Sequence, residues 1–291
     1  MILPENTVIG FIGTGVMGKS MAGHLLHAGY PLVVYSRTKA KAEELIAKGA
    51  EWASSPNEVA EKANVIITIV GYPADVEEIY LGEQGIITNG KENTIVIDMT
   101  TSTPTLASEI YEVAAKKGMF ALDAPVSGGD IGAKEAKLSI MVGGDKDAFE
   151  AVKPIFNLLG TNVVYQGKAG SGHHTKMCNQ IAIASNMIGV CEAVVYAEKA
   201  GLDPETVLQS ISSGAAGSWS LSNLAPRMIQ GNFDPGFYIK HFIKDMNIAL
   251  QEAEEMGMET PGLALAKKMY ARLAEAGGEN SGTQALYKYW E

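Results

Sequence analysis

One run of the sequence places a lysine and an asparagine on the same face of a predicted helix. In GSGHHTKMCNQ, residues 170–180, Lys176 and Asn179 are three residues apart. On a helix, two such side chains lie about 60° apart. A lysine in an otherwise apolar helix either extends its amine to solvent or is held where burial lowers its pKa enough for proton transfer. The residues alone leave both interpretations open.

A glycine-rich turn near the N-terminus has the pattern of a dinucleotide-binding loop. An apolar run, TVIGFI, leads into this turn, and a helical segment follows it. Glycines at such positions permit a tight turn and let the N–H groups at the helix start approach a pyrophosphate. Because strand, turn and helix occur in the required order, the sequence predicts dinucleotide binding rather than a connecting turn. The predicted cofactor contacts are Gly13, Thr14, Gly15, Val16, Met17 and Gly18.

The residues after the second predicted strand indicate which dinucleotide binds. An Asp or Glu there would bind the ribose hydroxyls of NAD, but this sequence has Ser36, Arg37, Thr38 and Lys39. Arg37 can bind a 2′-phosphate with two hydrogen bonds, whereas a carboxylate would repel it. We therefore expect NADP(H), with NAD as the weaker alternative. The competing interpretation is that Arg37 and Lys39 are ordinary solvated charges.

A third run, DAPVSGG, follows a predicted strand and could bind an anion. It ends in Ser127, Gly128 and Gly129. Free backbone N–H groups and one hydroxyl at the carboxyl end of a strand suit a small carboxylate. The alternative is a flexible turn between a strand and a helix.

The remaining titratable clusters are weaker candidates. Lys244 and Asp245 lie within another helical run, FIKDM, where a solvated charge pair is an equally good interpretation. His173, His174 and Cys178 do not predict a metal site, because adjacent histidines point in different directions on a helix and no zinc-like ligand spacing accompanies them.

Two kinds of segment must position these residues. From Thr7 to Val164, short β-rich runs alternate with helical stretches, which predicts an α/β domain with a mostly parallel sheet of six to eight strands. Beyond Gln166 the strand signals disappear, so we expect a division into residues 1–166 and a helical domain of residues 167–291. The first helix of that second domain should run from about His173 to Lys199.

Composition excludes several classes of protein. The 291 residues are 46% hydrophobic and 19% charged, which indicates a compact globular chain. A net charge of -10 argues against nucleic-acid partners, since most of the surface would repel a polyphosphate. Two cysteines and an N-terminus without the layout of a signal peptide indicate a cytoplasmic protein. We expect no membrane partner, because polar residues interrupt the apolar run from Met177 to Cys191.

Taken in order, GFIGTGVMG, DAPVSGG, GSGHHTKMCNQ and IKDM resemble the β-hydroxyacid dehydrogenase family over essentially the whole chain. The resemblance is strongest to its 3-hydroxyisobutyrate dehydrogenase and tartronate semialdehyde reductase branches. It implies a Rossmann-type doubly wound sheet followed by an all-helical substrate and dimerisation domain, with the active site in the cleft between them. It also implies a homodimer or homotetramer.

Site roles follow from the resemblance by position. Lys176 would be the catalytic lysine with Asn179 as its partner, and Ser127, Gly128 and Gly129 would hold the substrate carboxylate. The remaining implied cofactor contacts are Val70, Gly71, Lys244 and Thr101, the last of them near the nicotinamide end of the cofactor. Val70-Gly71 replaces a Leu-Pro pair common in the family, and Gln180 replaces an asparagine of some members.

The resemblance implies an NADP-dependent oxidoreductase acting on a small β-hydroxyacid or its semialdehyde, with 3-hydroxyisobutyrate as the leading substrate. Tartronate semialdehyde or succinic semialdehyde reduction is the alternative within the family. An alternative of another class is a catalytically silent NADP-binding interaction module, against which Lys176 argues. Imine reduction is a weaker alternative, since relatives with that activity generally lack the lysine.

Overall fold

The computed structural model describes residues 2–290. The chain forms two compact units, residues 1–176 and residues 177–291. The division falls inside one continuous helix, α9 (Ser171–Lys199), which was expected from about His173 to Lys199. Units 1 and 2 below refer to these two parts.

Unit 1 is built on a nine-stranded sheet with the order β3-β2-β1-β4-β5-β6-β8-β7, and β9 pairs with β8. The first six strands are all parallel. β8 runs antiparallel to β6 and β7 and parallel to β9. The strands are β1 (Ile9–Ile12), β2 (Leu32–Tyr35), β3 (Glu51–Trp52), β4 (Val65–Thr68), β5 (Ile95–Asp98), β6 (Phe120–Asp123), β7 (Val126–Ser127), β8 (Leu138–Gly144) and β9 (Gly160–Gly167).

This architecture confirms the predicted parallel α/β fold, with one strand more than the upper limit expected. The β-rich runs recognised in the sequence form the strands β1, β2, β4, β5, β6 and β8. β3 and β7 have two residues each, too few to show a pattern in the sequence. β9 lies at an edge and is polar and partly exposed, so it lacks the apolar signature of a buried strand.

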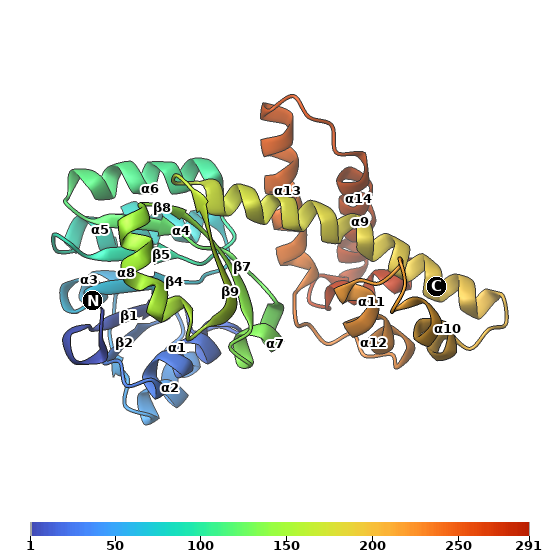
Figure 1. Cartoon of the computed structure of the whole chain (residues 1–291), viewed down its shortest axis with the longest axis horizontal. Helices are drawn as coiled ribbons and strands as arrows, with labels where there is room; N and C mark the ends of the chain where they lie inside the picture. Colours follow the sequence, from blue (N-terminus) through green and yellow to red (C-terminus); the bar gives the residue numbers. More distant parts are fainter. Residues whose placement is uncertain (1, 291) are drawn as a thin grey trace. The chain divides into compact units, whose positions relative to one another are not determined.

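Helices cover both faces of this sheet (Figure 1). Successive strand residues point to opposite faces, so Phe11 and Ile12 lie in two different cores. The same alternation occurs in β2, β4 and β5, which explains why these strands are apolar throughout. The helices are α1 (Gly18–His27), α2 (Glu43–Ala47), α3 (Pro56–Lys62), α4 (Pro73–Leu81), α5 (Ile86–Asn89), α6 (Pro104–Lys116), α7 (Gly129–Lys134) and α8 (Lys146–Phe156), with short 3-10 turns η1 (Pro4–Asn6) and η2 (Lys39–Ala42).

Unit 2 is helical, as predicted. Its core joins Cys191 and Val194 of α9 to Phe242 and Met246 of α13 and to Tyr270 of α14. After the C-terminal part of α9, the chain forms α10 (Pro204–Ile211), α11 (Trp219–Asn223), α12 (Ala225–Ile229), α13 (Ile239–Glu255), α14 (Pro261–Leu273), η3 (Ala274–Gly278) and η4 (Thr283–Trp290).

Helix α9 is long and apolar enough, by length and composition, to cross a bilayer. Length and composition alone do not distinguish a membrane-spanning helix from a buried one, so the expectation of no membrane partner stays a prediction. A packed core helix meets the same criterion, and Cys191 and Val194 of α9 belong to the core of unit 2.

The start of α9 packs directly against strand backbone. A Cβ on Gly172 would meet the carbonyl oxygen of Met141 and would come within 2.6 Å of the carbonyl oxygen of Asp123. A Cβ on Gly143 of β8 would lie 2.8 Å from the Gly172 nitrogen. Glycine at both positions therefore lets the first turn of α9 lie against β6 and β8.

We expect Gly172→Ala to destabilise the protein by about 1–3 kcal/mol, the usual cost of forcing extra atoms into a packed core. Gly189, exposed on the same helix with open space around it, is the matched control. Gly189→Ala should be neutral or stabilising by about 0.5–1 kcal/mol, since alanine favours helix. Urea unfolding monitored by circular dichroism measures both, and equal stabilities of the two variants would contradict this packing.

Candidate functional site

The glycine loop between β1 and α1 has the geometry that a bound diphosphate requires. Gly13 has φ +102°, and a Cβ there would collide with the carbonyl oxygen of Ile69. A Cβ on Gly18 would collide with the carbonyl oxygen of Gly13, so α1 can approach the turn only with glycine at this position. Around Gly15, by contrast, no atom lies within 4 Å of a built Cβ. These are the three roles that the dinucleotide-binding pattern assigns to its glycines: a tight turn, an open approach for pyrophosphate and close helix packing.

Polar groups in this loop fit a bound anion. Thr14 is 2% exposed, yet its Oγ1 has no hydrogen-bond partner among the described residues. Met17, the N-cap of α1, makes no side-chain cap. The amide groups at the helix start and the Thr14 hydroxyl can therefore donate to a phosphate, and the helix dipole favours its negative charge.

Ser36, Arg37 and Thr38 follow β2 directly, at the same edge of the sheet as the glycine loop. Arg37 is largely exposed, and its Nη1 donates to Oδ1 of Asp75 at 2.9 Å. The other oxygen of Asp75 accepts from the backbone N–H of Tyr72 at the start of α4. A single Nη1 contact leaves other guanidinium N–H groups for a phosphate.

The loops after β4 and β5 are joined by a hydrogen bond from the N–H of Val70 to Oγ1 of Thr100 at 3.0 Å. A cofactor contact from the Val70-Gly71 segment must therefore use groups other than this N–H. Thr101, the predicted contact near the nicotinamide, is partly exposed in the loop after β5. The next residue, Ser102, is buried, and its Oγ lacks a hydrogen-bond partner among the described residues.

The Ser-Gly-Gly turn lies between β7 and α7. Gly128 and Gly129 have φ of +127° and +63°, values that residues other than glycine rarely adopt. Ser127, Gly128 and Gly129 are all partly exposed, so the turn can meet a small ligand. Consecutive residues of this kind expose backbone N–H groups to an anion.

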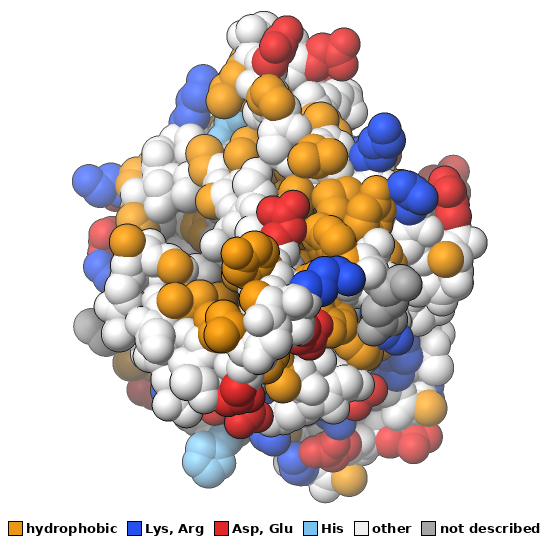
Figure 2. Space-filling model, turned by 90° about the vertical axis from the view of Figure 1, so that its right-hand side faces the viewer, with side chains coloured by type: hydrophobic (Ala, Val, Ile, Leu, Met, Phe, Trp, Pro, Cys, Tyr) orange, Lys and Arg blue, Asp and Glu red, His pale blue; other side chains and the backbone are white. Residues whose placement is uncertain are grey.

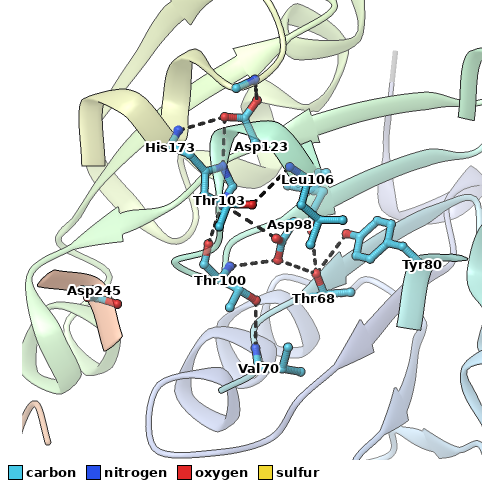
Figure 3. Close-up of polar contacts among 12 residues, drawn as sticks. Thr68, Val70, Tyr80, Asp98, Thr100, Thr103, Leu106, Asp123, His173 and Asp245 are labelled. Carbon is cyan, nitrogen blue, oxygen red and sulfur yellow. Dashed lines mark hydrogen bonds and ion pairs between the residues drawn. The ribbon is translucent and has the colours of Figure 1, made fainter. Parts of the chain in front are cut away.

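Beneath these loops, a buried polar network joins strand ends to the first turn of α9 (Figure 3). Asp98 and Asp123 occupy paired positions at the ends of β5 and β6. Asp123 accepts from the ring Nδ1 of His173, and the ring Nε2 lies 3.1 Å from the carbonyl oxygen of Thr100. Asp98 accepts from the Thr68 hydroxyl and from the N–H of Thr100. Burial raises the pKa of Asp98, although His173 and these hydrogen bonds oppose the shift.

The sequence analysis did not select His173, Asp98 or Asp123 as site residues. The available signal was an acidic residue at the carboxyl end of two successive strands. These two acidic residues indicate a shared site only once β5 and β6 are known to be neighbouring strands on which Asp98 and Asp123 are paired.

Lys176 lies one turn after His173 on α9 and is 7% exposed. Of the two interpretations left open by the sequence, burial favours the lysine held within the protein. It belongs to unit 1, together with the glycine loop, Arg37, Thr101 and the Ser-Gly-Gly turn.

The other predicted residues lie in unit 2, where they form a second polar cluster. Asn179 donates from Nδ2 to Oε1 of Gln180 at 2.8 Å, and Gln180 donates from Nε2 to Oδ2 of Asp245 at 2.6 Å. Lys244 Nζ lies 2.9 Å from the other oxygen of Asp245. Gln180 is fully buried and four residues after Lys176, so on α9 it shares the lysine's face and is more buried than Asn179.

Among residues 2–290, no group of three or more His, Cys, Asp or Glu side chains is arranged to hold a metal ion. His173 is instead bonded to Asp123 and Thr100.

Two family models together match nearly the whole chain. Residues 8–167 match the NAD-binding domain of 6-phosphogluconate dehydrogenase. Residues 170–290 match the "NAD-binding of NADP-dependent 3-hydroxyisobutyrate dehydrogenase" family.

Several curated proteins are similar over their full length. The chain is 66% identical to an uncharacterized oxidoreductase of Bacillus subtilis, covering 97% of this chain and 98% of that protein. It is 50% identical to a probable mitochondrial 3-hydroxyisobutyrate dehydrogenase-like protein of Arabidopsis thaliana, covering 98% and 86%. It is 39% identical to 2-hydroxy-3-oxopropionate reductase of Escherichia coli, covering 97% of each.

A solved structure shows the same fold with a cofactor bound. Psf3 in complex with NADP⁺ and 2-OPP superposes with a TM-score of 0.92 at 25% identity, covering 98% of this chain and all of that one. Family models, relatives and fold agree with the glycine-loop geometry. The chain belongs to the 3-hydroxyisobutyrate dehydrogenase family of NAD(P)-dependent oxidoreductases.

Proposed function

We propose that the protein interconverts a small β-hydroxyacid and its semialdehyde with NADP(H), and that 3-hydroxyisobutyrate is its leading substrate. The observation that carries this proposal is the buried Lys176 in the unit that also holds the dinucleotide loop. The names of the Arabidopsis relative and of the second family model support the substrate.

Lys176 is the proton-transfer group in this proposal. When bound, the nicotinamide accepts or supplies the hydride at its C4 atom. In oxidation, the neutral Lys176 amine takes the proton of the substrate hydroxyl as the carbinol hydride leaves. In reduction, the Lys176 ammonium donates that proton to the oxygen of the aldehyde.

Ser127, Gly128 and Gly129 hold the substrate carboxylate, since their turn combines one hydroxyl with exposed N–H groups. In unit 2, Asn179 and Lys244 are proposed to contact substrate and cofactor, respectively. Because its amide donates to Gln180, Asn179 presents its carbonyl oxygen as an acceptor.

A second candidate is reduction of tartronate semialdehyde, also called 2-hydroxy-3-oxopropionate. It is favoured by the Escherichia coli relative, which aligns over 97% of both chains. Its reduced product, glycerate, differs from 3-hydroxyisobutyrate by a hydroxyl in place of a methyl group, so both reactions would use the same carboxylate binding and proton transfer.

We also propose a homodimer or homotetramer. Figure 2 shows hydrophobic side chains exposed among polar and charged ones on the face that it presents. In unit 2, Tyr196 and Trp219 are 74% and 54% exposed, and Leu202 and Leu265 are more than half exposed. Exposed large apolar side chains that form a contiguous patch are typical of protein contacts.

Replacing the lysine tests the proposed chemistry. Lys176→Ala should lower kcat by roughly a hundredfold or more, because proton transfer is lost, while NADPH affinity is retained. Lys176→Arg keeps a positive charge but cannot release a proton at neutral pH, so it should lower kcat to a similar extent. The control is Lys199→Ala at the exposed end of the same helix. Steady-state rates and fluorescence titration of NADPH measure the two quantities, and a fully active Lys176→Ala enzyme would rule out this role.

Arg37 tests the cofactor preference. Arg37→Ala should raise KM for NADPH about tenfold, equivalent to ~1.4 kcal/mol, and leave KM for NADH unchanged, because only the 2′-phosphate contact is lost. Lys91→Ala removes an exposed positive charge that precedes β5, at the opposite edge of the sheet, and should change neither value. Equal effects on NADPH and NADH, or better use of NADH by the unmodified enzyme, would contradict NADP preference.

A substrate panel separates an enzyme from a silent binding module. We expect NADP-dependent oxidation of 3-hydroxyisobutyrate, with glycerate as the product-side test of the second candidate and 4-hydroxybutyrate and serine turned over more slowly. Absorbance at 340 nm follows the reaction. Tight NADPH binding with no turnover of any of the four acids would instead support the module.

A further inference from the structure

The first turn of α9 is fixed to the sheet by one carboxylate, that of Asp123. Its Oδ1 accepts from the N–H of Gly170, and its Oδ2 accepts from the N–H of His173, each at 2.9 Å. Oδ2 also lies 3.1 Å from Nδ1 of the His173 ring. The helices α3, α6 and α8 are capped by the residue that precedes them, Ser55, Thr103 and Asp145. Helix α9 is instead anchored by a strand end about 50 residues earlier in the chain.

The His173 ring connects this anchor to a second loop. Its Nε2 lies 3.1 Å from the carbonyl oxygen of Thr100, which immediately precedes Thr101. A carbonyl oxygen can only accept, so Nε2 carries a proton in this bond. Nδ1 faces the carboxylate of Asp123, which also accepts from the backbone N–H groups of Gly170 and His173. His173 is fully buried, and Asp98 Oδ2 lies 3.9 Å from Nε2 on the same side.

We propose that His173, held by Asp123, is a positioning residue that sets the location of Lys176 relative to the Thr100-Thr101 loop. His173 and Lys176 are three residues apart on α9 and therefore share a face. One imidazole thus bonds to the loop predicted to contact the nicotinamide end of the cofactor and to the anchor of the helix that carries the lysine. Because His173 is fully buried, we assign it a role through Lys176 rather than a contact with substrate or cofactor. This inference rests on the proposed function of Lys176.

The cost of the arrangement argues for a role beyond holding the fold. Buried polar groups lose their hydration, and well-packed apolar residues often stabilise a protein as much or more. The hydrogen bonds of Asp123 and His173 are directional, so they can fix the rotation of α9 about its axis, whereas apolar packing cannot. A displacement of about 1 Å at a reacting group can lower a rate on the order of a hundredfold.

The chain offers a matched control, because His174 is the exposed neighbour of His173 on the same helix. We expect His173→Ala to lower kcat by roughly ten- to a hundredfold, with KM for NADPH unchanged. His173→Gln keeps one donor and should recover part of the loss, and His174→Ala should match the unmodified enzyme. A primary isotope effect on kcat with NADPH deuterated at the transferred position should increase in His173→Ala, since hydride transfer becomes rate-limiting.

A double substitution tests whether the two side chains act through one another. Asp123→Asn places an amide donor among the donors of Gly170 and His173 and should reduce kcat as well. If His173 and Asp123 act as one unit, the double variant loses little more kcat than the more impaired single variant. Losses that multiply would show independent effects and overturn the proposal.

The proposal is also overturned if His173→Ala lowers only the unfolding temperature, or if His174→Ala lowers kcat equally. If His173→Ala does not fold, His173→Gln provides the test: the rate of Lys176 labelling by an amine-reactive reagent, followed by peptide mass spectrometry, must differ from that of the unmodified protein. An unchanged labelling rate and an unchanged isotope effect refute positioning. Full activity of Lys176→Ala would instead refute the proposed function itself.

Discussion

The carboxylate of Asp123 is the interaction on which the candidate site depends. It ends a central strand, caps the helix that carries Lys176, and bonds to the ring of His173. Gly172 and Gly143 make this possible, because side chains at either position would keep the helix away from the strands. These contacts hold the first turn of α9 against the sheet. The backbone that carries the long Lys176 side chain is therefore rigidly placed.

Although the whole chain is negatively charged, one edge of the sheet carries groups that attract anions. A net charge of -10 disfavours polyanions, yet the edge of the sheet that carries the glycine loop gathers groups that bind phosphate. Thr14 offers a hydroxyl, α1 offers the positive end of its dipole, and Arg37 offers a guanidinium held by Asp75. These groups suit a dinucleotide carrying an additional phosphate rather than a continuous polymer.

Local patterns in the sequence were sufficient for the main elements. The glycine loop, the apolar strands β1, β2, β4 and β5 and the long helix α9 each depend on residues close together in the chain. Contacts between distant residues were not accessible in this way: the Asp123–His173 bond spans 50 residues, and the Gln180–Asp245 bond spans 65. Asn179 as the partner of Lys176 stays a prediction; Gln180, four residues after the lysine on the same helix face, is more deeply buried than Asn179.

The central claim is that Lys176 exchanges a proton with the substrate oxygen beside an NADP cofactor whose 2′-phosphate is bound by Arg37. A crystal structure of the Lys176→Met variant, which keeps the bulk of the side chain and traps the complex with NADP⁺ and 3-hydroxyisobutyrate, would test it most directly. We expect the 2′-phosphate on Arg37, the carboxylate on the Ser-Gly-Gly turn, and the hydroxyl oxygen where a lysine amine at position 176 would lie about 2.6–3.2 Å away. A substrate oxygen bound out of reach of position 176 would contradict it.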